Sequence, residues 1–163
     1  MDEIVQDESA SETDIILNGD PKINALQSKF GQGSLRLDGA SYLSVPSDSH
    51  SLDFGNGDFT LEFWMYSERN YQERIITSGG NGFFLQKKYG NQLVLTINSK
   101  KYTTETPVVE QNVWKHIAIS RKDGIFRLFV SGELVMTVGS EIGYTMPNIL
   151  NIGSDSTYLY RYP

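Results

Sequence analysis

Tyrosines outside the apolar runs of the sequence are the residues best suited to hold a ligand. Five of them lie in expected loops or near the C-terminal end: Tyr71, Tyr89, Tyr144, Tyr158 and Tyr160. An exposed tyrosine offers an apolar ring face for stacking on a sugar and a hydroxyl for hydrogen bonding. The same residue type is enriched where proteins contact each other, so these side chains are candidates for binding a glycan or a protein.

Three oxygen-bearing side chains lie close together just before a long apolar run. Asp53, Asn56 and Asp58 follow the spacing Asp-x-x-Asn-x-Asp in a glycine-containing segment. Carboxylate and amide oxygens are calcium ligands, so a calcium ion could bind here. The alternative, which we favour, is a turn in which these side chains cap backbone amides. We expect no other cofactor.

The residue types needed for catalysis do not occur in usable arrangements. The chain has no cysteine and only two histidines, which excludes a thiol nucleophile and an HExxH zinc site. Ser47, Asp48 and His50 lie in one short polar segment, where such close neighbours cannot form a nucleophile relay. His116 lies in an apolar run, where we expect a hydrogen-bonded structural histidine rather than a general base. We therefore expect no enzymatic activity.

Acidic residues concentrate at the start of the chain. Seven of the 20 acidic residues precede the first basic residue, Lys22. The remainder has 14 basic and 13 acidic side chains, and this near-neutral balance is not typical of nucleic-acid binding. Segment 1–14 is too polar to fold alone, so we expect an assembly arm held by its own sheet or by another chain. Five residues are candidates for assembly contacts. Four belong to the arm and one lies near the C-terminal end: Asp2, Glu3, Asp7, Glu8 and Tyr162.

The sequence carries no membrane or secretion signal that we recognise. No apolar run approaches the roughly 18 residues that indicate a membrane helix, so we expect no membrane insertion. The first residues are acidic where a secretory signal would be basic and then apolar. We therefore expect synthesis in the cytoplasm without a signal peptide.

Short apolar runs separated by turn residues dominate the rest of the sequence. Eleven runs rich in β-branched and aromatic residues predict strands, at 33–38, 42–45, 59–66, 74–77, 83–86, 93–97, 101–104, 114–120, 126–130, 133–136 and 149–152. Asp123-Gly124 and Ser131-Gly132 are typical of tight hairpin turns and predict an antiparallel meander between 114 and 136. A second meander is predicted between 74 and 97. Together these elements predict an all-β sandwich.

Two features of these runs predict how side chains divide between faces. Alternation places Phe126, Leu128 and Val130 on one face, and Ile125, Arg127 and Phe129 on the other. If the second meander forms, four lysines lie on a solvated hairpin face: Lys87, Lys88, Lys100 and Lys101.

Four separated blocks repeat a pattern of aromatic, polar and glycine residues found in a known family. They read Gly-Asp-Phe-Thr-Leu-Glu-Phe-Trp at 57–64, Trp-Lys-His-Ile-Ala-Ile-Ser-Arg at 114–121, Leu-Phe-Val-Ser-Gly-Glu-Leu-Val at 128–135 and Leu-Asn-Ile-Gly at 150–153. Together they resemble the laminin G-like version of the concanavalin A-like jelly roll, and the opening block at 27–43 is similar to versions common in tailed-phage virion proteins. The resemblance implies a two-sheet antiparallel jelly-roll sandwich over residues 15–157, with Trp64 and Trp114 anchoring its interior.

Two departures from the resembled family bear on function. Catalytic relatives on this fold carry a Glu-x-Asp-x-x-Glu strand, whereas the strand here reads Glu-Phe-Trp-Met-Tyr-Ser from Glu62, which disfavours an endoglycanase. Related domains also continue into a closing strand that the tail at 158–163 does not match. Either the chain is a fragment of a longer polypeptide, or the N-terminal arm or another subunit replaces that strand.

These observations predict a non-catalytic binding and assembly module. The resemblance favours a phage virion structural protein, such as a capsid decoration, spike or tail-fibre component. Its partners would be other virion subunits or a second copy of the chain, it would be located in the virion, and its sandwich would contact host-surface glycans. The alternative is a carbohydrate-binding lectin module of a larger secreted or surface protein, and an endoglycanase is the least favoured.

Overall fold

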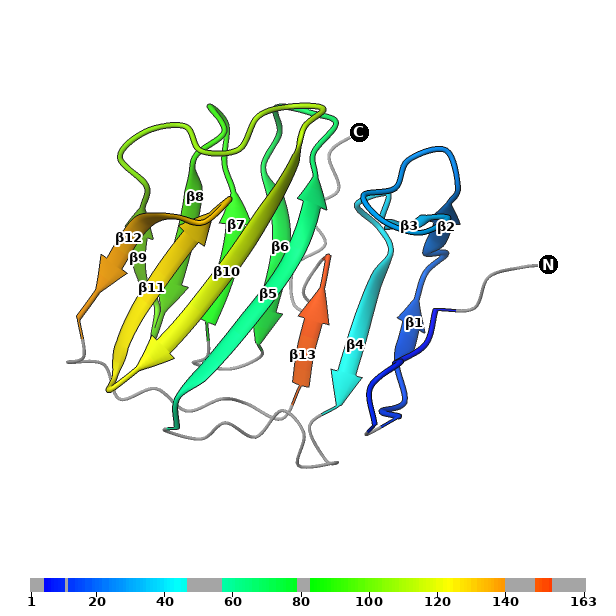
Figure 1. Ribbon diagram of the computed structural model, residues 1–163, viewed down its shortest axis with the longest axis horizontal. Helices are drawn as coiled ribbons and strands as arrows, with labels where there is room; N and C mark the ends of the chain where they lie inside the picture. Colours follow the sequence, from blue (N-terminus) through cyan, green and yellow to red (C-terminus); the bar gives the residue numbers. More distant parts are fainter. Residues whose placement is uncertain (1–4, 11, 47–56, 79–82, 140–148, 154–163) are drawn as a thin grey trace.

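The structure, a computed structural model, describes residues 5–10, 12–46, 57–78, 83–139 and 149–153. These residues form strands and no helix (Figure 1). The strands are β1 (Ile16–Asn18), β2 (Lys22–Asn24), β3 (Ser34–Arg36), β4 (Tyr42–Pro46), β5 (Phe59–Tyr66), β6 (Glu73–Ser78), β7 (Phe83–Lys87), β8 (Leu93–Ile97), β9 (Lys100–Thr103), β10 (Trp114–Lys122), β11 (Ile125–Val130), β12 (Glu133–Val138) and β13 (Ile149–Ile152). Each of the eleven predicted runs overlaps a strand, so the all-β prediction is confirmed. In the described part of the chain, no helix is long and apolar enough to span a bilayer.

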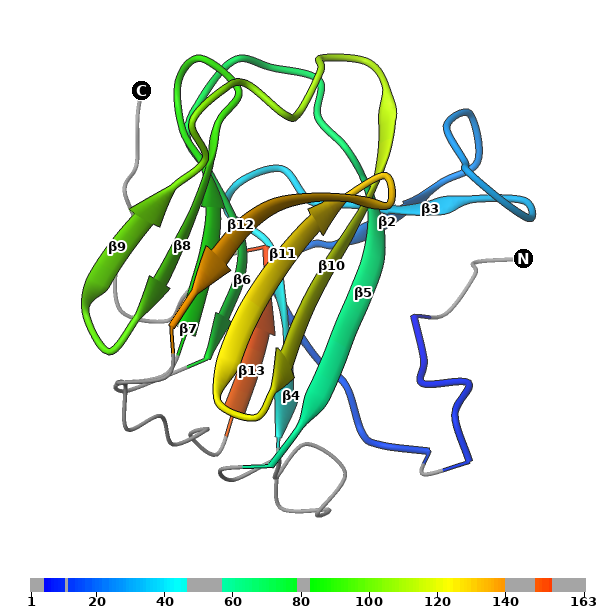
Figure 2. The same ribbon diagram turned by 60° about the vertical axis from the view of Figure 1, so that its left-hand side comes forward.

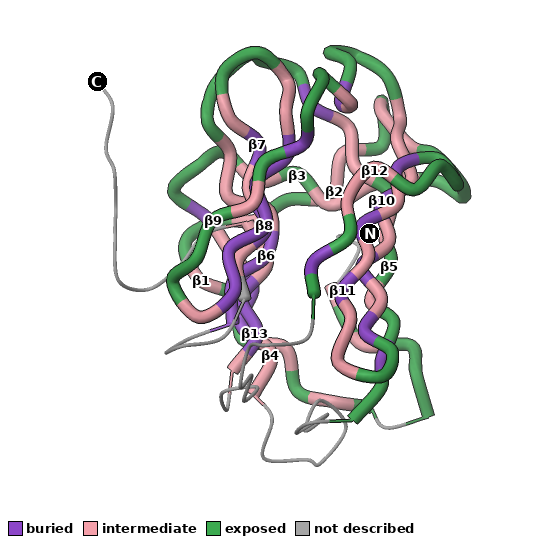
Figure 3. The backbone as a smooth tube through the Cα atoms, turned by 90° about the vertical axis from the view of Figure 1, so that its left-hand side faces the viewer, coloured by how far each residue is buried: buried purple, intermediate pink, exposed green. Residues whose placement is uncertain are grey.

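Two antiparallel sheets packed face to face form the body of the molecule. One has seven strands in the order β1-β4-β13-β6-β7-β8-β9, and the other has four in the order β12-β11-β10-β5. Seen edge-on, they form two separate layers (Figure 3). Strands β2 and β3 pair only with each other and extend away from the sandwich (Figure 2). The predicted jelly-roll sandwich is therefore confirmed.

The hairpin turns explain why consecutive strands pair. Asp123 and Gly124 have φ angles of 51° and 76°, and Ser131 and Gly132 have φ angles of 50° and 87°. Two successive residues at positive φ are the requirement of the type I′ turn, whose twist matches that of two paired strands. The turns place β10, β11 and β12 side by side. The predicted meander between 114 and 136 is thus confirmed, as is the pairing of β6, β7 and β8 in the second meander.

Alternation along the strands decides which side chains enter the core. On β11, Phe126, Leu128 and Val130 are buried, whereas the residues between them are half-buried. They pack against other fully buried side chains from both sheets, including Leu85, Leu95, Ile117 and Ile119. The predicted division of faces on this strand is confirmed.

The prediction that Trp64 and Trp114 anchor the interior is wrong. Phe63 is the cross-strand partner of the core residue Ile117, so Phe63 points inward and Trp64 points outward. Trp64 is 38% exposed and contacts His116, with 5.2 Å between the ring centroids. Trp114 lies on the same outer face, 5.3 Å from the ring of Tyr66. The outer face of the four-stranded sheet is therefore lined with aromatic rings.

Strands β1 and β2 have no counterpart among the predicted runs. Each has three residues, too few for an alternating pattern to be visible in the sequence. Strand β1 forms the edge of the seven-stranded sheet by pairing with β4. Residue 153 is the last described residue, so the predicted tail at 158–163 lies outside the described part of the chain.

Candidate ligand-binding site

Two of the five predicted ligand-binding tyrosines lie together at one end of the sandwich. The rings of Tyr71 and Tyr89 have centroids 5.8 Å apart and meet at 73°, an edge-to-face arrangement. Their side chains are 56% and 62% exposed. We call this pair the tyrosine corner, because two accessible ring faces meet there at nearly a right angle.

Strand register explains why residues 18 positions apart in the sequence become neighbours. Glu73, the first residue of β6, pairs with Lys87, the last residue of β7. Tyr71 precedes Glu73 by two residues and Tyr89 follows Lys87 by two. Both tyrosines therefore lie beyond the same end of the paired strands β6 and β7. Strand β5 of the other sheet also ends at this end of the sandwich (Figure 1).

A tight turn between β7 and β8 presents Tyr89. The backbone N–H of Asn91 donates to the carbonyl of Lys88 at 3.1 Å, which closes the turn with Tyr89 in its second position. Gly90 in the third position has a φ angle of 81°, which favours glycine because it lacks a Cβ. Two backbone amides of the neighbouring segment, those of Val108 and Val109, donate to the carbonyl of Asn91 at 3.0 and 3.1 Å. The turn is thereby held against the rest of the domain.

A side-chain hydrogen bond joins the two loops that carry the tyrosines. Asn70 Oδ1 accepts from the backbone N–H of Gly90 at 3.0 Å. This bond orients the amide of Asn70, an exposed residue whose Nδ2 can donate to a ligand. The corner thus combines two apolar ring faces with a positioned polar group.

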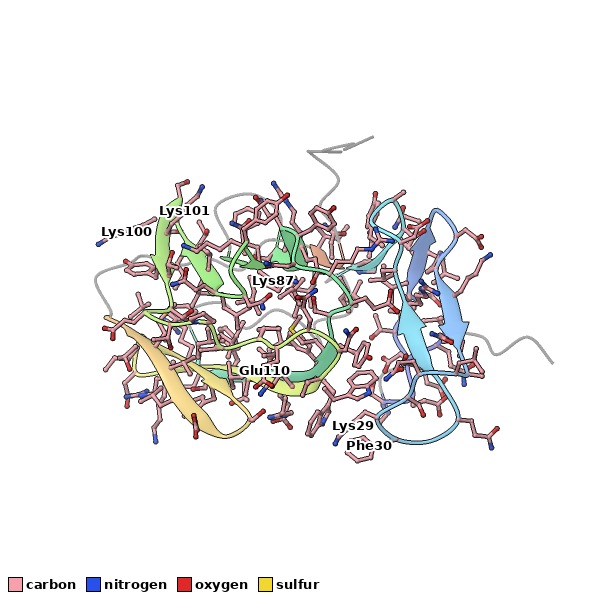
Figure 4. The ribbon with its side chains drawn as sticks, turned by 90° about the horizontal axis from the view of Figure 1, so that it is seen from above. Lys29, Phe30, Lys87, Lys100, Lys101 and Glu110 are labelled. Atoms are coloured by element: carbon pink, nitrogen blue, oxygen red, sulfur yellow. The ribbon has the colours of Figure 1, made fainter. Side chains whose placement is uncertain are left out.

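Lys87 lies directly beneath the tyrosine corner and is completely buried. Its ammonium group donates to Ser67 Oγ at 2.5 Å and to the carbonyl of Arg69, and it lies 3.3 Å from Glu73 Oε2. Ser67 Oγ in turn donates to the carboxylate of Glu73 at 2.9 Å. In Figure 4, Lys87 lies within the outline of the sandwich. One buried charge therefore connects the ends of β5, β6 and β7.

Burial of Lys87 contradicts the prediction of four solvated lysines. Lys87 is the cross-strand partner of the core residue Leu93, so alternation turns its side chain inward. Lys100 and Lys101, the first two residues of the edge strand β9, are exposed as predicted (Figure 4). The prediction failed for Lys87 because lysine is almost never fully buried unless it is paired, and its partners come from another strand and a loop.

The other predicted site residues do not join the corner. The tyrosines at 144, 158, 160 and 162 lie outside the described residues, as do Asp2, Glu3, Asp53 and Asn56. Asp58 Oδ1 accepts from the backbone N–H of Asp123 at 2.9 Å, so it caps the β10–β11 turn. Within the described ranges, no three acidic or histidine side chains are grouped as metal ligands. Calcium binding stays a prediction.

The described residues of the acidic arm bond to one another. Asp7 accepts from the backbone N–H groups of Ser9 and Thr13, both at 2.8 Å. These hydrogen bonds, together with that from the Ser9 hydroxyl, lower the pKa of Asp7 to about 2. Glu8 accepts from the side-chain amide of Gln6. The predicted assembly role of the arm stays a prediction.

Comparison with known proteins defines the family. Residues 37–162, well over half of the chain, match the Laminin_G_3 family model, described as concanavalin A-like lectin/glucanases superfamily. The chain belongs to this superfamily. Over 96 residues this concanavalin A-like domain is 33% identical to Sushi, von Willebrand factor type A, EGF and pentraxin domain-containing protein 1 of Rattus norvegicus. That match covers 54% of the chain and 3% of the rat protein.

Solved structures with low sequence identity share the same fold. The binding domain of botulinum neurotoxin DC in complex with SialylT superimposes with a TM-score of 0.67 at 14% identity, covering 91% of this chain and 40% of that one. Domain 4 of AbnA, an extracellular arabinanase of family GH43 from Geobacillus stearothermophilus, was solved in complex with arabinotriose. It gives a TM-score of 0.60 at 15% identity, with coverage of 85% and 72%.

Proposed function

We propose that this concanavalin A-like domain is a non-catalytic glycan-binding module and that the tyrosine corner is its binding site. The observation that carries the proposal is the exposure of both rings on loops that a buried charge network holds in place. Rings that are already ordered lose little conformational freedom when a ligand binds, so more of the contact energy contributes to affinity.

The composition of the corner suits a sugar. A pyranose has an apolar face of C–H groups that stacks on an aromatic ring, while its hydroxyls need hydrogen-bond partners. Tyr71 and Tyr89 provide the rings and their own hydroxyls, and Asn70 provides an oriented amide. Support from relatives comes from the two structures above, which were solved with SialylT and with arabinotriose.

The angle between the rings indicates which shape of glycan fits. Rings at 73° cannot both stack on one flat surface. A single sugar ring can stack on one tyrosine while its edge contacts the other. The corner therefore favours a chain end or a short oligosaccharide over the flat face of a long polysaccharide.

The carboxylates near the corner are engaged in structural contacts, which supports a non-catalytic role. Glu73 binds Lys87 and Ser67, and Glu68 Oε2 lies 3.4 Å from Arg36 Nη2. Glycoside hydrolysis requires one carboxyl group as a proton donor and a second as nucleophile or base. Glu68 and Glu73 would each have to break an ion pair to take either role.

A virion structural protein is the more specific form of this proposal. A capsid decoration, spike or tail-fibre protein with virion subunits as partners would use the same corner to contact host-surface glycans. A lectin module of a larger secreted or surface protein remains the alternative.

A glycan array followed by calorimetry tests the proposal. We expect the wild-type domain to bind a set of short glycans, and Tyr71→Ala and Tyr89→Ala each to weaken binding about tenfold, equivalent to about 1.4 kcal/mol. Phe30→Ala is the matched control, because Phe30 is 68% exposed but lies on the β2–β3 loop. Absence of any array hit, or equal losses in all three variants, would show that the corner is not a glycan site.

A further inference from the structure

Strand β5 begins and β10 ends at the opposite end of the sandwich (Figure 1). Residues at these strand ends line a shallow depression. It has a volume of about 390 Å³ and is lined by Asp58, Phe59, Thr60, Ser120, Arg121, Lys122 and Arg127. We call it the basic depression, because three of its seven lining residues are cationic and one is acidic. It shares no residue with the tyrosine corner.

The single acid of the basic depression does not neutralise its cations. Asp58 uses one carboxylate oxygen to accept the N–H of Asp123. Among the described residues, no acid forms an ion pair with Lys122 or Arg127. Lys122, Arg127 and Asp58 together carry a net formal charge of +1, and a concave surface with an excess of one sign of charge concentrates anions.

Arg121 points to the inner face of the sheet, because it alternates with Ser120 and Lys122 and pairs with the core residues Phe59 and Phe126. It is only 8% exposed, its Nη1 donates to the carbonyl of Gly57 at 2.7 Å, and its guanidinium carbon lies 5.8 Å from the centre of the Phe126 ring. These contacts engage the guanidinium on the inner side of the sheet. The cations that face the depression are therefore Lys122 and Arg127.

Two hydroxyl groups lie beside the cations in one cross-strand row. Thr60 is the register partner of Ser120, and Ser120 is the register partner of Arg127. Cβ atoms of directly opposite residues in antiparallel strands are roughly 4.5–5.5 Å apart. The row therefore places two hydroxyl donors and a guanidinium on one face, with Lys122 two residues beyond Ser120 on the same strand and face.

We propose that the basic depression binds a tetrahedral oxyanion, a sulfate or a phosphate group. Such a group has four oxygens, enough to contact both hydroxyls as well as Lys122 and Arg127, whereas the two oxygens of a carboxylate are satisfied by one arginine. The anion is either a free ion or an ester carried by a larger molecule. The proposal is independent of glycan binding at the tyrosine corner.

NMR titration of the ¹⁵N-labelled domain at constant ionic strength tests the site. With sodium chloride as the baseline, we expect sulfate and phosphate to cause saturable shifts of the amide signals of Thr60, Ser120 and Arg127. Half-saturation near 1 mM would correspond to about 4 kcal/mol of binding free energy. Glucose 6-phosphate distinguishes the sources: tighter binding than phosphate supports an ester, and equal binding supports the free ion.

Charge-removing variants show whether the shifts come from this site. Lys122→Gln combined with Arg127→Gln should raise the dissociation constant at least tenfold, whereas Lys101→Gln, on the exposed edge strand β9, should leave it unchanged. Ser120→Ala provides a second variant if the double variant does not fold, and it should weaken binding several-fold. Linear shifts identical to those in chloride, equal saturation by acetate, or unchanged binding in the site variants would overturn the proposal.

Discussion

Replacing Lys87 by methionine removes the buried charge that joins three segments beneath the tyrosine corner. The methionine side chain fills similar space but cannot donate to Ser67, the Arg69 carbonyl or Glu73. Removing one partner of a buried ion pair costs about 3–5 kcal/mol when the other charge is left in the interior. The Glu73 side chain is 33% exposed, so water can solvate much of its charge, and we expect a smaller loss of about 2 kcal/mol.

Thermal unfolding gives the first measurement of this change. For a domain of this size, 1 kcal/mol corresponds to roughly 2–4 °C in melting temperature, so Lys87→Met should melt about 4–8 °C below the wild type. Lys88→Met is the matched control, because Lys88 is the next residue and is only half-buried, and it should stay within about 0.5 kcal/mol. Glu73→Gln leaves the fully buried ammonium of Lys87 without its counter-charge, so it should destabilise the domain at least as much as Lys87→Met.

Local order at the corner gives the second measurement. The N–H of Gly90 is bonded to Asn70 on the loop that Lys87 holds, so its hydrogen exchange should accelerate in Lys87→Met more than that of core amides in β8. If the corner is formed only one tenth of the time, glycan affinity should fall about tenfold. A Lys87→Met protein that melts within about 1 °C of the wild type, with unchanged Gly90 exchange, would refute the argument that this charge organises the loops.

Three further predictions concern other parts of the chain. In Trp114→Phe, acrylamide should quench the fluorescence of Trp64 efficiently, because that ring is 38% exposed on the outer face; emission typical of a buried indole would contradict the assigned strand face. The folded pKa of Asp7, about 2, lies below its usual value of 3.8, so the turn that it caps should be stable above pH 4 and be lost as the pH falls through 2, which the amide signals of the arm will report. Deletion of residues 1–14 should leave the circular dichroism and melting temperature of the sandwich unchanged, since the side-chain hydrogen bonds of Asp7 and Glu8 lie within the arm. A lower melting temperature would mean that the arm contributes to the domain, and loss of co-sedimentation with a particle would support its assembly role.

The strands and turns could be predicted from the sequence where a turn conformation requires particular residue types. Asp123-Gly124 and Ser131-Gly132 adopt the positive φ angles that few other residue pairs tolerate. The meander of β10, β11 and β12 follows, because each of these tight turns pairs the two strands that flank it. Strand β1 lacks any such signal, since its position at the sheet edge depends on β4, which lies more than 20 residues away.

The face of Trp64 could have been read correctly from alternation alone. Along β5, Thr60 and Glu62 share its face, and Phe63 belongs to the opposite set. Two polar residues indicate a solvent-facing side. The family resemblance predicted an interior position for Trp64 instead. Because both faces of β5 carry aromatic residues, either orientation of the strand would place apolar side chains in the core.

The tyrosine corner was only half predictable. The sequence indicates that Tyr71 and Tyr89 are in loops, but their meeting depends on the register between Glu73 and Lys87, which includes an irregularity between Arg74 and Ile76. A bulge of this kind inserts an extra residue and shifts one strand against the other. No local pattern in the sequence reveals it, so the pairing of the tyrosines is a consequence of tertiary structure.

The two proposed sites stand at opposite ends of β5 and should act independently. At about 3.3 Å per residue, the eight residues of this strand separate the basic depression from the tyrosine corner by roughly 23 Å. This is nearly three times the distance of about 8 Å over which physiological salt screens a charge, so anions bound at one end should not alter the potential at the other. Substitutions more than about 10 Å apart usually act additively when they share no partner. Variants of each site are therefore controls for the other, and coupling between them would mean that β5 itself shifts when either ligand binds.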